Sequence, residues 1–84
     1  MPYIDIIWDL DDDPAGNVQH ISQHGLTKDD VRWVLEHPMV HEVSRSSGRP
    51  LVKGYTPDDV YIVVVYDEVD EQTVYPVTAY EIAE

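Results

Sequence analysis

The hydrophobic pattern of this chain changes its period at Pro38, and that change limits the available folds more than any other feature. Before Pro38, apolar residues recur at helical spacing, as at Val31, Val34 and Leu35. After Pro38, apolar and polar residues alternate with the two-residue period of strands. Helices followed by a run of strands are typical of an α+β domain, in which the helices pack on one face of an antiparallel sheet.

Local signals place the elements of the first half. A β-branched and aromatic run predicts a strand over 3–8. Asp13 followed by Pro14 is the pattern of an N-cap and first helical residue, and a helix is expected from there to Gly25. We expect its inner face to carry Val18, Ile21 and either His24 or the neighbouring Gln23.

A second helix is predicted over 28–37. Thr27 and Asp30 have the spacing of a capping box, with Asp in the place of Glu, and Pro38 forces the helix to end. Four strands should follow, separated by a turn at 56–59 and a polar loop at 67–72, and they are expected over 40–44, 50–55, 60–66 and 73–82. The predicted order is β-α-α-β-β-β-β in a single domain, because 84 residues suffice for only one core. The strand at 60–66 is apolar on both sides, so the pattern does not decide which of its faces is buried.

The charge of the chain is strongly acidic, with 17 acids against 5 bases and a formal net charge of -12. Such a balance opposes non-specific attraction to phosphate and favours either a basic partner or simply solubility. Three of the bases nevertheless fall within one acid-free stretch, 44–56, and they are Arg45, Arg49 and Lys53. Strand alternation places Arg49, Leu51, Lys53 and Tyr55 on one side, so these cations are expected to line a sheet face.

Several classes of site lack the residues they need. Without cysteine there is no disulfide, thiolate nucleophile or zinc–thiolate site, and a reducing, cytoplasmic location is expected. We expect no membrane segment, no metal and no cofactor, since no long apolar run and no phosphate-binding glycine motif is present. His20 and His24 have the spacing of a zinc-binding pair but lack a third ligand. Asp9, Asp11 and Asp13 begin like a calcium loop that Pro14 then breaks.

A longer pattern resembles the BrnT-type toxins of bacterial toxin–antitoxin modules, which are relatives of the RelE-type ribonucleases. The matching segments span most of the chain: Trp8-Asp9, Gly16 to Thr27 with Asn17, His20, His24 and Gly25, Asp30-Val31 with Val34-Leu35 and Pro38, Gly48-Arg49-Pro50 before Gly54, and Tyr75 to Ala79. The chain departs from the family where Asp11 to Asp13 replace a basic residue and where Tyr80 follows Ala79 in place of arginine. It therefore resembles a diverged member.

The resemblance implies a metal-independent endoribonuclease whose sheet face binds RNA, and an antitoxin partner with a ribbon-helix-helix fold. Cleavage of RNA without a metal needs groups for proton transfer and cations that face the charge of the transition state. The candidate catalytic residues are Arg49, Lys53, Tyr55 and Tyr80, with His20 or His24 as further proton carriers. The candidate RNA contacts are Arg45, Arg49 and Lys53.

Two hypotheses of different class follow. In the first, the chain is a BrnT-like toxin that cleaves RNA. In the second, it is a non-catalytic, acidic protein-interaction module with the same fold. The nuclease hypothesis requires Arg49 and Lys53 to be available together to one polyanion. Separate pairing of each cation with its own carboxylate would count against it.

Overall fold

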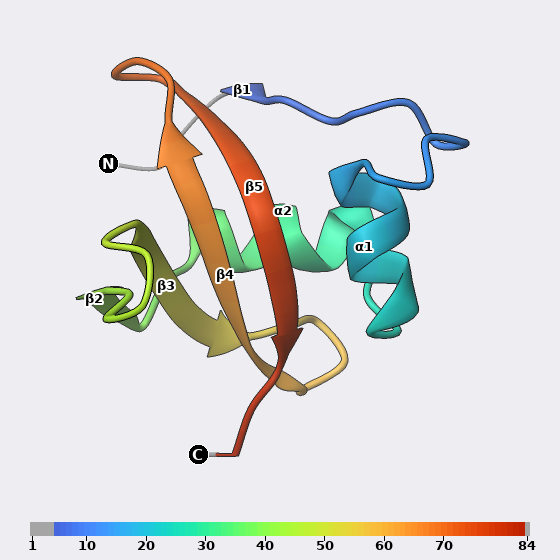
Figure 1. Ribbon diagram of the computed structural model, residues 1–84. Helices are drawn as coiled ribbons and strands as arrows, with labels where there is room; N and C mark the ends of the chain where they lie inside the picture. Colours follow the sequence, from blue (N-terminus) through green and yellow to red (C-terminus); the bar gives the residue numbers. More distant parts are fainter. Residues whose placement is uncertain (1–4, 84) are drawn as a thin grey trace.

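The computed structural model describes residues 5–83, which form two helices and one five-stranded sheet (Figure 1). The helices are α1 (Asn17–Gln23) and α2 (Lys28–Glu36). The strands are β1 (Asp5–Ile6), β2 (Val40–Val43), β3 (Pro50–Tyr55), β4 (Tyr61–Glu68) and β5 (Thr73–Glu81). The predicted order of elements is confirmed, although Tyr3 and Ile4 of the predicted first strand lie outside the described residues. Neither described helix is long and apolar enough to cross a membrane.

The sheet is mixed, with the strand order β1-β5-β4-β3-β2. Strands β2 to β5 form the predicted antiparallel meander. Strand β1, however, runs parallel to β5, with Asp5 opposite Thr73 and Ile6 opposite Val74. The expectation of a wholly antiparallel sheet is therefore wrong. A hairpin turn fixes the relative direction of the strands it joins, but β1 reaches β5 only after two helices and three other strands.

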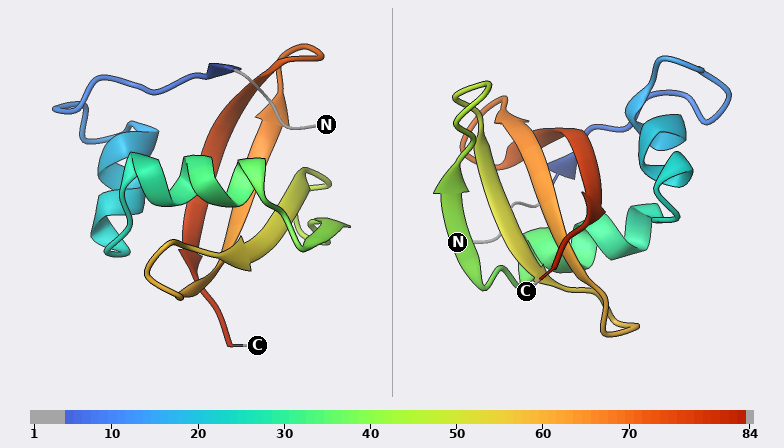
Figure 2. Two further views of the ribbon diagram at one scale, coloured as in Figure 1. Left: turned by 180° about the vertical axis from the view of Figure 1, so that it is seen from behind. Right: turned by 60° about the horizontal axis from the view of Figure 1, so that its bottom comes forward.

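Both helices lie on one side of the sheet, as predicted, and leave the other face open. In Figure 1, α2 crosses behind the central strands, and the left view of Figure 2, seen from the opposite side, shows it in front of them; α1 lies beside β5. Ile62, Val64 and Tyr66 of β4 join the helices in the main core, whereas the intervening Val63 and Val65 lie outside that cluster. Since successive side chains of a strand point to opposite faces, Val63 and Val65 belong to the open face.

Helix α1 begins at Asn17 and not at Pro14. The Asp13 carboxylate accepts a hydrogen bond from the Ala15 amide at 3.0 Å, and the Gly16 amide donates to the Asp13 carbonyl oxygen at 3.0 Å. These bonds form a turn, and Gly16, in an extended conformation, then precedes the helix as its N-cap. His24 is exposed and not on the inner face, because α1 ends at Gln23.

Helix α2 follows its local signals closely. The Thr27 hydroxyl accepts from the Asp30 amide at 3.2 Å and the Asp30 carboxylate accepts from the Thr27 amide at 3.0 Å, so the predicted capping box is present. Val31, Val34 and Leu35 are buried as predicted. The end of α2 packs directly on β3: a Cβ atom at Gly54 would lie 3.3 Å from both the His37 carbonyl oxygen and Val34 Cγ1.

Candidate functional site

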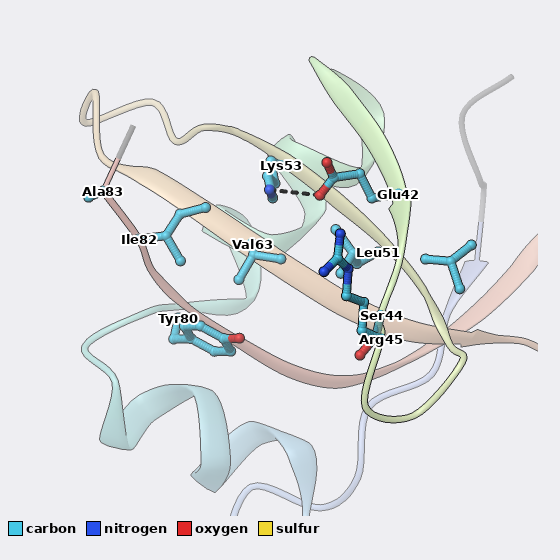
Figure 3. A pocket seen from close by; sticks show the side chains of 10 residues that line it. Glu42, Ser44, Arg45, Leu51, Lys53, Val63, Tyr80, Ile82 and Ala83 are labelled. Carbon is cyan, nitrogen blue, oxygen red and sulfur yellow. Dashed lines mark ion pairs between the residues drawn. The ribbon is translucent and has the colours of Figure 1, made fainter.

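The open face of the sheet carries a pocket of about 710 Å³ (Figure 3). Leu51 from β3 and Val63 from β4 contribute apolar surface to it. Its polar lining comes from β2, from the turn after β2, from β3 and from β5, and it includes Glu42, Ser44, Arg45, Lys53 and Tyr80. Three of the five predicted site residues are therefore brought together: Arg45, Lys53 and Tyr80.

The other two predicted residues do not line this pocket. The ring of Tyr55 packs against Tyr61, with 4.9 Å between the ring centroids. Arg49 lies just before β3, and its side chain contacts Asp67 of β4. The predicted group of Arg49, Lys53 and Tyr55 is thus spread along β3 and does not converge on one point.

Lys53 is paired with a carboxylate from the neighbouring strand. Its Nζ lies 2.7 Å from Oε1 of Glu42. The hydrogen bond to Glu42 holds the pKa of Lys53 above its usual value, and the negative charge of Glu42 acts in the same direction, against the opposing effect of burial. Lys53 therefore stays protonated at neutral pH and cannot accept a proton there.

Arg49 is paired in the same way with a different carboxylate. Its Nε donates to Oδ1 of Asp67 at 2.8 Å. Both side chains are close to half exposed, so the pair contributes only about 0–1 kcal/mol to stability. Arg49 and Lys53 are consequently each neutralised by a separate carboxylate, and this arrangement counts against a joint role in binding phosphate.

Sequence reasoning missed these two carboxylates, although the register of the sheet explains both. Leu51 lies opposite Val65 in the β3–β4 pair, and the same register continued by two residues sets Arg49 opposite Asp67. In the β2–β3 pair, Val40 lies opposite Lys53, which makes Glu42 its diagonal neighbour. Opposite charges at such positions attract, so a correct prediction of register would have identified them.

Tyr80 connects the pocket to His24, which caps the end of α1, and through it to His20. The ring centroids of Tyr80 and His24 are 5.9 Å apart, and those of His24 and His20 are 5.5 Å apart. These three side chains, all proposed above for proton transfer, therefore form one row beside the pocket. Within residues 5–83, no group of three or more acidic or histidine side chains is placed to hold a metal ion.

A second polar network joins the segment after β1 to α1 and β5. The buried side chain of Asn17 donates from Nδ2 to the carbonyl oxygens of Ile7 and Pro76, both at 3.0 Å. Its Oδ1 accepts from the Asp9 amide at 2.9 Å. The Asp9 carboxylate in turn accepts from the Asn17 amide at 2.8 Å and from the Tyr75 hydroxyl at 2.6 Å. The sequence did not predict that Asn17 joins these three segments. The only indication was that Asn17 belongs to the pattern shared with the BrnT-type toxins.

Acid is expected to destabilise the protein through Asp9. The hydrogen bond from Tyr75 and that from the Asn17 amide hold the pKa of Asp9 below its ordinary value of 3.8. A carboxyl group with a lowered folded-state pKa stabilises the fold when ionised, so this contribution is present above pH 3.8 and is lost as the pH falls further. Urea unfolding measured from neutral pH down to about pH 2 should show this loss.

The Asp9→Asn variant is expected to lose part of that acid dependence. The backbone amide of Gln72 and the hydroxyl of Thr73 similarly lower the pKa of Asp70, so the Asp70→Asn variant should lose another part. An Asp9→Asn protein whose stability falls with acid as steeply as that of the wild type would contradict the assignment.

Comparisons with protein families, with curated proteins and with solved structures find no match to this chain.

Proposed function

We propose that this chain is a diverged BrnT-like protein that acts as a non-catalytic module and binds a basic protein surface. One observation carries the proposal: four of the five basic side chains lie in ion pairs within the chain, and they are Lys28, Arg32, Arg49 and Lys53. All five bases belong to the described residues, and Arg45 is the one without such a partner.

The remaining surface charge is almost wholly negative. Among the described residues, the acids that pair with these four bases are Asp11, Glu36, Glu42 and Asp67, whereas the chain holds 17 acids in all. A molecule of this charge repels RNA, because affinity for nucleic acid comes largely from cations that displace the counterions of phosphate. It attracts a basic protein and speeds the encounter with it.

Several carboxylates converge near the start of β5. The negative charges of Asp9, Asp13 and Asp67 all contribute to the raised pKa of Tyr75, after its hydrogen bond to Asp9 and its burial. These three residues come from the loop before α1 and from the end of β4. We therefore place the docking site of the basic partner on this face, around Tyr75.

The proposed partner is a ribbon-helix-helix protein, because the resemblance to BrnT-type toxins implies one. A DNA-binding protein must carry basic side chains for contact with phosphate, and such a surface complements this one. The order of elements, with two helices before an antiparallel meander, agrees with what the resemblance implies and supports a RelE/BrnT-like topology.

Endoribonuclease activity is a second candidate function, favoured by one observation. The pocket brings Arg45, Lys53 and Tyr80 together, and His24 packs on Tyr80. This set contains cations and proton-transfer groups, which are what cleavage of RNA without a metal requires.

Binding to a purified ribbon-helix-helix protein encoded beside this gene tests the proposal. We expect a complex that weakens with salt, because exposed charges are screened beyond about 10 Å at 0.1 M salt. The double variant Asp12→Asn/Asp13→Asn removes charge from the carboxylate cluster around Tyr75. It should bind about tenfold more weakly than the wild type. The matched double variant Asp58→Asn/Asp59→Asn, altered in the turn between β3 and β4, should change affinity less than about twofold. Equal losses in the two variants, or no complex, would contradict the proposal.

The same proteins separate the two candidate functions. If the module is non-catalytic, expression of the wild type leaves growth unchanged and the purified protein leaves RNA intact. If it is a nuclease, the wild type inhibits growth, and the Arg45→Ala and Lys53→Ala variants, both altered in the pocket, relieve that inhibition. Their melting temperatures should stay close to that of the wild type, because Arg45 is exposed and Lys53 loses only one partly exposed ion pair.

A further inference from the structure

The pocket on the open sheet face differs in charge from the rest of the molecule. Arg45 and Lys53 line it together with one acid, Glu42, which is already paired with Lys53 at 2.7 Å. The three side chains therefore carry one net positive charge, and the unpaired cation is Arg45. Within residues 5–83 every other lysine and arginine side chain has a carboxylate partner.

The geometry places this charge beside apolar surface. In Figure 3, Val63 lies between the ring of Tyr80 on one side and Leu51 and the Arg45 side chain on the other, and the Tyr80 hydroxyl points toward the pocket. Val63 is only 3% exposed, although no helix covers this face. The apolar lining is completed by Val43, Ile82 and Ala83.

We propose that this pocket binds one carboxylate group attached to an apolar body. The planar guanidinium of Arg45 matches a carboxylate with two parallel hydrogen bonds. The Tyr80 hydroxyl donates a further hydrogen bond, and the apolar body covers the partly exposed Leu51 and Ile82. Burial of apolar surface drives such binding, while the few polar groups fix the orientation of the ligand.

A carboxylate fits the charge of the pocket better than a phosphate does. A phosphate monoester carries about -1.5 to -2 charges at pH 7. Only one net positive charge is present to meet it, and the Glu42 carboxylate repels any excess. The extended polyanion of RNA is opposed more strongly still, because the surrounding surface is acidic.

Two sources supply this ligand chemistry: the carboxyl terminus of a polypeptide that ends in an apolar residue, and a free small carboxylic acid. The site uses none of the carboxylates around Tyr75, so it is independent of the proposed docking face. Its test can therefore fail without any bearing on that proposal.

Titration calorimetry with three probes tests the inference. Hexanoate represents the free acid, and an alanine-rich pentapeptide ending in leucine, with a free or an amidated carboxyl group, represents the polypeptide. We expect the free-carboxyl peptide or hexanoate to saturate the protein with a Kd of about 1 mM. The amidated peptide should bind at least about tenfold more weakly, since it lacks the charge that pairs with Arg45. Preference for the peptide over hexanoate identifies a polypeptide terminus as the source, and the reverse identifies a free acid.

Three variants make the test specific. Arg45→Ala should weaken binding of the better probe about tenfold or more. Glu42→Gln should tighten it severalfold, because Lys53 then adds an unneutralised charge to the pocket. Arg32→Ala removes the same charge from α2, where Arg32 pairs with Glu36, and should change Kd less than about twofold.

The inference is overturned if neither carboxylate saturates, if Arg45→Ala and Arg32→Ala have equal effects, or if Glu42→Gln fails to tighten binding. It is also overturned if a short oligouridylate binds in this pocket more tightly than either carboxylate. That last result would support the nuclease candidate. Amide chemical shifts at Val63 and Tyr80 verify that the variants are folded and that the probe occupies the pocket.

Discussion

Replacement of Asn17 by alanine is expected to lower the free energy of unfolding by about 4 kcal/mol. The Asn17 side chain is 2% exposed and makes three hydrogen bonds to backbone groups. Alanine leaves the Asp9 amide and the carbonyl oxygens of Ile7 and Pro76 without these partners. The bond to the Pro76 carbonyl oxygen is buried and the other two are partly buried, and a polar group left without its partner costs about 1–3 kcal/mol when buried and less when water can reach it. A domain of this size is stable by about 4–13 kcal/mol, so the variant should be close to unfolding.

Urea denaturation of three variants checks this role. Gln23→Ala changes an exposed residue at the end of the same helix and should cost less than about 0.5 kcal/mol. Asn17→Asp retains the acceptor for the Asp9 amide but loses both donors and adds a charge beside the Asp9 carboxylate. It should be at least as unstable as Asn17→Ala. A loss below about 1 kcal/mol in Asn17→Ala would show that the network does not hold β1, α1 and β5 together.

Replacement of Ile62 by alanine is expected to cost about 3 kcal/mol, within the usual range for truncation of a buried isoleucine. Ile62 is fully buried between β4 and the helices and belongs to the main core. The truncation loses the transfer free energy of the removed carbons and leaves a cavity that the surrounding elements only partly fill. The change should appear as a lower urea midpoint with an unchanged slope.

A matched pair on the same strand tests which face of β4 meets the helices. Val64→Ala removes carbons from the main core and should cost about 2 kcal/mol or more. Val63→Ala removes the same carbons from the open face and should cost about 1 kcal/mol, because flexible side chains such as Lys53 and Tyr80 can close over the gap. Equal costs, or a larger cost for Val63→Ala, would contradict this assignment of faces.

The second helix was predicted well because its signals are local. The Thr27–Asp30 capping box and Pro38 act within one turn of the helix ends, and the stripe of Val31, Val34 and Leu35 depends only on helical spacing. The start of α1 was predicted poorly for the opposite reason. Asp13 and Pro14 form a favourable helix start. The helix nevertheless begins at Asn17, because the carboxylate of Asp9, eight residues earlier, accepts a hydrogen bond from the Asn17 amide.

The candidate site was predicted in part. Strand alternation placed Leu51 and Lys53 on the same side of their strand, and both line the pocket. It supplied no information on which strand lies beside which or in what register. Only the folded chain therefore shows that Glu42 pairs with Lys53 and Asp67 with Arg49. It also shows that Tyr55 lies outside the pocket that Tyr80 lines.

The sequence by itself determined the elements, their order, the acidic charge and the parity of β3, because periodicity, caps and turns act between residues close along the chain. The tertiary structure alone decided the parallel β1–β5 pair, the face of β4 that meets the helices, and the neutralisation of Arg49 and Lys53. These features depend on contacts between segments far apart in sequence. Such contacts are selected by burial and charge pairing in the whole fold, which no local pattern encodes.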